Sequence, residues 1–100
     1  MGAKSKHETR VSMPADCRIA DVGELHTQLK GALGSSQIVL DGAAVDRIDT
    51  AALQLLVVFQ HEAKKRERHV QWAGASVPLY DAAGQLGLME ALALPAKKPA

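Results

Sequence analysis

The alternation of hydrophobic and polar positions predicts three short strands. Residues 9–13 alternate between polar and apolar side chains and come just before Pro14, which favours a strand that ends there. Residues 38–40, Ile-Val-Leu, form a continuous apolar run, as in strands that are covered on both faces of a parallel sheet. Residues 69–73 alternate again and indicate a third strand.

Apolar residues at helical spacing predict three helices, one after each strand. The first helix has Asp21 as a capping residue and Gly34 as its end. The second covers residues 50–66, is apolar nearly all round in its first half and is charged in its second. The third begins at Ser76 and is closed by Gly87. The spacing is carried in the first helix by Val22, Leu25, Leu29 and Leu33, and in the third by Leu79, Ala82, Ala83 and Leu86.

This order of elements predicts an α/β fold, in which a small sheet with parallel pairs is joined by right-handed crossovers. We expect one domain over residues 8–94, whose apolar end piece, residues 88–94, packs back on the sheet. Residues 1–7 and 95–100 are polar or proline-containing, and we expect a disordered leader and a disordered tail.

The composition narrows the class of protein. The chain has 100 residues with 47% hydrophobic and 23% charged residues and a net charge of +1, so we expect neither disorder nor an overall field that attracts nucleic acid or anionic lipid. Cys17 is the one cysteine, which excludes an internal disulfide. The longest apolar run is residues 55–59, far short of the roughly 20 residues that span a bilayer. We expect a soluble cytoplasmic protein without membrane insertion or a secretory signal.

Catalytic and metal-binding patterns are weak. His7, His26, His61 and His69 have no metal-ligand spacing on one helix face, and no glycine-rich phosphate loop follows a strand. We therefore predict no catalytic residues, no metal and no cofactor. Residues 64–68 are basic, but Glu62 and Glu67 lie among them, which is typical of a solvated helix end rather than a nucleic-acid site.

The most informative stretch is residues 41–53, which joins a buried strand to the apolar helix. Thr50 falls at the start of that helix, where backbone N–H groups lack partners and can bind oxygen ligands. One interpretation is that Asp49 or Thr50 only caps the helix, for about 1 kcal/mol. The other is that Thr50 accepts a phosphate, whose charge would be stabilised by the helix start and repelled by Asp46 and Asp49. A receiver domain with Asp41 as the acceptor is a third alternative, but it requires an acidic pair after the first strand to hold Mg²⁺.

These residues resemble the STAS domain family (sulphate transporter and anti-sigma factor antagonist). The matching strings are Val39-Leu40-Asp41 with residues 48–56, then residues 73–79, then residues 85–88. The resemblance covers residues 8–94. It implies a STAS-like α/β fold with a small mixed or parallel sheet covered by about four helices.

The resemblance also implies a bacterial, non-enzymatic regulator that binds a protein partner. In anti-sigma factor antagonists a kinase phosphorylates the hydroxyl at the position of Thr50, and the unmodified form binds the kinase or anti-sigma factor. The implied contact residues are Asp46, Arg47, Ile48, Asp49, Ala51, Ala52, Leu53 and Leu56.

Two departures from the family pattern bear on the partner. Ala52 stands where the family usually has glycine, and Asp16 is a single acid where many antagonists carry two. The short first strand and the Asp-Thr motif are also similar to the cytoplasmic STAS subunit of the bacterial phospholipid-transport ATPase. The alternative function is therefore a subunit that binds an ATPase.

Overall fold

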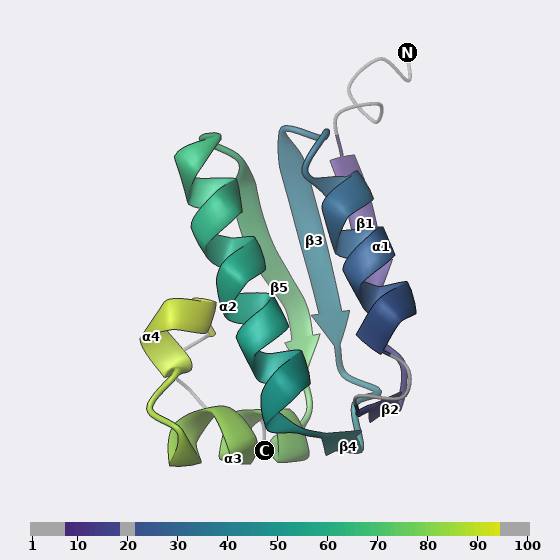
Figure 1. Cartoon of the computed structure of the whole chain (residues 1–100), viewed down its shortest axis with the longest axis vertical. Helices are drawn as coiled ribbons and strands as arrows, with labels where there is room; N and C mark the ends of the chain where they lie inside the picture. The colour runs from purple at the N-terminus through teal and green to yellow at the C-terminus, as the bar shows by residue number, and fades with distance from the viewer. Residues whose placement is uncertain (1–7, 19–21, 95–100) are drawn as a thin grey trace.

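A three-stranded parallel sheet forms the centre of the computed structural model, which describes residues 8–18 and 22–94 (Figure 1). Its strands are β1 (Glu8–Ser12), β3 (Gln37–Gly42) and β5 (His69–Ala75), in the order β1-β3-β5. The helices are α1 (Val22–Ala32), α2 (Thr50–Lys65), α3 (Val77–Gln85) and α4 (Met89–Leu92). A second parallel pair joins β2 (Asp16–Cys17) to β4 (Arg47–Ile48). The predicted α/β fold with a small parallel sheet and four helices is confirmed. The expectations for Asp21, the leader and the tail fall outside the described residues.

One face of the sheet carries the core. Leu40 pairs in register with Val11 on one side and with Trp72 on the other, so these side chains share a face. Helices α1 and α2 lie in front of the sheet in Figure 1 and pack against this face. Leu40, Leu53 and other side chains of this cluster are no more than 1% exposed, which gives the domain its apolar core.

The opposite face of the sheet carries mostly polar side chains, yet residues 38–40 are all buried, as predicted for a strand that is covered on both faces. Val39 lies on this face and its register neighbours are Arg10 and Gln71, both exposed. Val39 itself is only 7% exposed.

The first helix ends without a left-handed glycine, in contrast to the expectation for Gly34. Helix α1 ends at Ala32, and the N–H groups of Leu33, Gly34 and Ser35 each donate to the carbonyl three residues earlier. Among the described glycines only Gly87 has a positive φ. Tight three-residue turns therefore end α1.

The predictions for the third helix are confirmed by its two caps. The Ser76 hydroxyl accepts a hydrogen bond from the Leu79 N–H at 3.2 Å. At the other end Gly87 has φ 68°, and the Leu88 N–H donates to the Ala83 carbonyl at 2.8 Å. This pattern is a Schellman motif.

The apolar end piece packs back on the domain as predicted. Leu92 in α4 is 0% exposed. Its carbonyl accepts hydrogen bonds from Trp72 Nε1 in β5 and Gln60 Nε2 in α2, both at 2.8 Å. These two bonds attach α4 to the sheet and to the longest helix.

Candidate functional site

Asp49 caps the helix that carries the site. Its backbone is extended, with φ −114° and ψ 176°, and its Oδ1 accepts a hydrogen bond from the Ala52 N–H at 3.0 Å. The Asp49 carbonyl accepts the first helical bond, from the Leu53 N–H, at 3.1 Å. The capping interpretation therefore holds for Asp49, and Thr50 is the first residue of the helix rather than its cap.

Thr50 presents an exposed hydroxyl at the helix start. Both Thr50 and Ala51 are exposed, and their two N–H groups donate to no atom of the described residues. Unpaired N–H groups in a first helical turn attract oxygen ligands and negative charge. A phosphate on Thr50, as in the phosphoacceptor interpretation, would lie next to these two N–H groups.

The loop before Thr50 is fixed by backbone pairing. The N–H groups of Asp46 and Arg47 both donate to the Ala15 carbonyl, at 2.8 and 3.0 Å. The parallel register of β2 and β4 then aligns Asp16 with Arg47 and Cys17 with Ile48. A partner would therefore meet a preformed surface here, with little ordering of the backbone on binding.

The acidic groups near the site are largely paired. Arg18 donates to both oxygens of Asp16 at 2.8 Å, and these hydrogen bonds hold the pKa of Asp16 below its usual value. Asp46 is exposed in the loop, four residues before Thr50. Asp46 and Asp49 would repel a phosphate on Thr50. Solvent and salt screen this repulsion and make it weaker.

Asp41, the acceptor in the receiver alternative, is tied into the sheet. Its Oδ1 accepts a hydrogen bond from the Ala43 N–H at 3.1 Å, and its Oδ2 pairs with Arg10 at 3.3 Å. Among residues 8–18 and 22–94, no three His, Cys, Asp or Glu side chains are grouped to hold a metal ion. Nothing in the described geometry favours a receiver.

The structure places three of the predicted contact residues in the core. Ala52, Leu53 and Leu56 are 0%, 1% and 0% exposed. Their side chains pack inward on the same stripe of α2 and are not available to a partner in this conformation. The accessible part of the predicted surface is Asp46, Arg47, Thr50 and Ala51, with Ile48 and Asp49 half-buried.

Sequence reasoning missed the apolar side chains that α2 leaves accessible. Leu55 is half-buried and Val58 is 59% exposed. Both line hollows between α1 and α2, together with His26. The apolar width of residues 50–60 was the available signal, but it could not tell which residues face outward.

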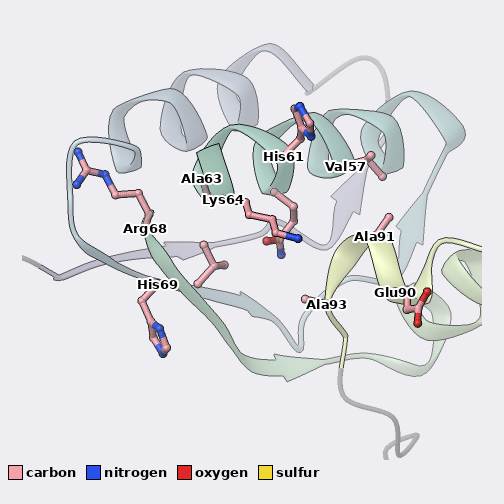
Figure 2. A pocket seen from close by; sticks show the side chains of 11 residues that line it. Val57, His61, Ala63, Lys64, Arg68, His69, Glu90, Ala91 and Ala93 are labelled. Atoms are coloured by element: carbon pink, nitrogen blue, oxygen red, sulfur yellow. The ribbon is translucent and has the colours of Figure 1, made fainter. Parts of the chain in front are cut away.

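Another hollow lies away from Thr50, between the end of α2, the start of β5 and α4 (Figure 2). It has a volume of about 490 Å³. Lys64 extends toward it, Glu90 lies on its α4 side, and Arg68 and His69 point away from its centre. Arg68 donates to the Leu33 carbonyl at 2.9 Å. Because both positive and negative side chains line this hollow, its charge does not indicate which class of ligand it would bind.

The basic residues at the end of α2 have local partners. Lys65 and Arg66 both pair with Glu62, at 3.7 and 3.4 Å. These pairs are exposed and contribute little to stability, but they reduce the net charge of the cluster.

Among the described helices, none has the length and apolar character needed to cross a membrane.

Comparisons with known proteins cover almost the whole chain. A family model described as "Mlab, STAS domain" matches residues 2–95. The crystal structure of a sulfate transporter family protein from Wolinella succinogenes is similar, with a TM-score of 0.69 and 24% sequence identity. That similarity covers 86% of this chain and 71% of the other. A comparison with curated proteins gave no match.

Proposed function

Because the chain belongs to the STAS domain family, a kind of regulatory and binding module, we propose that it binds a protein partner through the surface around Thr50. This docking surface consists of Asp46, Arg47, Thr50 and Ala51. The observation that carries the proposal is the exposed Thr50 hydroxyl beside two unpaired N–H groups at the start of α2. The protein acts in the cytoplasm by binding, without catalysis.

Phosphorylation of Thr50 switches this binding. The modification adds a charge near −2 and three acceptor oxygens. The first turn of α2 stabilises that charge, while Asp49 already supplies the cap, so the helix keeps its structure. The partner meets a changed surface on an unchanged domain, as in anti-sigma factor antagonists.

A second candidate is a STAS subunit of a phospholipid-transport ATPase. The description of the matching family model, "Mlab, STAS domain", favours it, as does the single acid after β1. The same docking surface would then bind an ATPase subunit continuously. The two candidates differ in the partner and in whether Thr50 carries phosphate.

Co-purification of the tagged full chain from the cells that make it tests the proposal. We expect a protein that is retained by the wild type and lost with Thr50→Glu, because a carboxylate would be buried against the partner. His61→Glu is the matched control, since His61 is exposed on the same helix and gains the same charge. Equal retention by both variants would contradict the proposal.

The identity of the retained protein separates the two candidates. An anti-sigma factor or kinase, together with phosphate on Thr50 by mass spectrometry after incubation with that kinase and ATP, supports the switch. An ATPase subunit bound to a chain without phosphate supports the transport subunit.

A further inference from the structure

A groove between α1 and α2 starts at the docking surface. Two hollows of about 310 and 240 Å³ follow one another between these helices and share His26, Leu55 and Val58. The first includes Ala51, the neighbour of Thr50, and the second ends at Arg66. The groove therefore runs along α2 from the proposed switch to the end of the helix.

Apolar side chains line the middle of the groove, with His26, Gln54 and the charged residues of its far end at the edges. Leu29 and Phe59 form buried parts of it, and Leu55 is half-buried. Val58, at 59%, is the most exposed large apolar side chain among the described residues. An apolar side chain that projects from an already apolar groove suits the apolar row of another helix.

Because α1 and α2 run in the same direction, the two ends of the groove differ in electrostatic potential. Each helix connects parallel strands, so α1 and α2 run the same way, and their starts lie at the same end in Figure 1. Their positive dipole ends lie near Ala51 and their negative ends near Leu33. A third helix in the groove is favoured in the antiparallel direction, with its C-terminal carbonyls toward Thr50.

The charges at the far end of the groove fit the start of such a helix. Lys30, Glu62 and Arg66 line that end, which therefore carries one more positive than negative side chain. Lys30 has no ion-pair partner among the described residues, whereas Arg66 pairs with Glu62 at 3.4 Å. Helices commonly carry acidic residues in their first turn, and these would lie against the Lys30 ammonium.

We propose that the groove binds an amphipathic helix of the protein partner, antiparallel to α2, with an acidic first turn at Lys30 and its C-terminal end at Thr50. This inference rests on the proposed function, because it extends the docking surface. It also gives the switch a mechanism. A phosphate on Thr50 faces the carbonyl end of the docked helix, where the two negative groups repel each other.

Photo-crosslinking with the full chain in the cells that make it tests the arrangement. A benzophenone amino acid replaces Val58 in the groove, Lys30 at its far end, Asp46 on the docking surface, or His61 outside both. We expect cross-links to one partner from the first three positions and none from His61. The partner residue linked to position 30 should precede, in the same helical segment, the residue linked to position 58.

The outcomes separate the groove from the docking surface. Cross-links from position 46 alone would overturn the groove and leave the docking surface intact. Cross-links from none of the three would overturn both. A second copy of this chain captured at position 58, or the reverse order of the linked partner residues, would overturn the proposed helix.

Binding to the captured partner gives an independent measurement. Val58→Glu should weaken affinity at least about tenfold, since a carboxylate would be buried in an apolar contact. His61→Glu should leave affinity unchanged. Thermal unfolding of both variants checks that each is folded, which we expect because both positions are exposed. Unchanged affinity in folded Val58→Glu would contradict the proposal.

Discussion

At the start of α2, Asp49 caps the helix and the adjacent Thr50 is exposed. Asp49 satisfies the Ala52 N–H and accepts the first helical hydrogen bond, while Thr50 keeps its hydroxyl at the surface. Because the helix does not depend on the Thr50 side chain, that side chain can be modified without loss of the fold. We therefore expect substitutions of Asp49 to lower stability and substitutions of Thr50 to leave the fold intact.

Asp49→Ala should lower the free energy of unfolding by about 1 kcal/mol, since the Ala52 N–H loses its acceptor. Chemical denaturation measures the change. Asp46→Ala is the matched control, because Asp46 is exposed in the same loop and should change stability by less than about 0.5 kcal/mol. Equal stability of the two variants would show that Asp49 does not cap the helix in solution.

Two glycines should respond to alanine in opposite directions. A Cβ on Gly42 would lie 2.7 Å from Leu79 Cδ2 and 3.2 Å from Trp72 Cζ3, whereas a Cβ on Gly31 in α1 meets nothing within 4 Å. Gly42→Ala should cost about 1–3 kcal/mol by overpacking. Gly31→Ala should stabilise by up to about 1 kcal/mol, because alanine favours the helix. Denaturation midpoints of the two variants that shift in the same direction would contradict this packing.

At the scale of elements, the Leu92 carbonyl in α4 accepts both side-chain hydrogen bonds that attach this helix to α2 and β5. Leu92 is completely buried, and its carbonyl accepts hydrogen bonds from both Trp72 and Gln60. Either donor alone still satisfies this carbonyl. Loss of both would leave a buried acceptor without a partner, which costs roughly 1–3 kcal/mol.

A double-mutant cycle with Trp72→Phe and Gln60→Met tests this attachment. The double variant should lose more stability than the two single variants together, by about 0.5 kcal/mol or more. Urea denaturation of the four proteins measures the coupling. Strict additivity would mean that the two donors do not share the Leu92 carbonyl.

The sequence predicted the elements best where short-range chemistry sets their ends. Asp49 and Ser76 cap α2 and α3, and Gly87 ends α3, each through groups within a few residues. The two-residue strands β2 and β4 were not predicted, because their pairing depends on a backbone contact between Ala15 and the loop before α2. Gly34 sits just beyond α1 but does not take the left-handed conformation that its type suggested.

At the scale of the whole molecule, the candidate site was predicted in part. The position of Thr50 at the start of a helix was predicted because a strand, an aspartate and an apolar helix follow one another in the sequence. The burial of Leu53 and Leu56 was not predicted. The first half of α2 is apolar nearly all round, so its pattern does not show which side of the helix faces the core. Packing against the sheet decides that rotation and leaves Val58 outside.

The affinity of the purified chain for its partner, compared between Thr50→Val and Thr50→Glu, tests the central claim most directly. Both variants should match the wild type in thermal unfolding, because Thr50 is exposed and Asp49 caps the helix. We predict a change of less than about threefold for Thr50→Val and a loss of at least about tenfold for Thr50→Glu. Wild-type affinity in folded Thr50→Glu would contradict the claim that this hydroxyl lies in the docking surface.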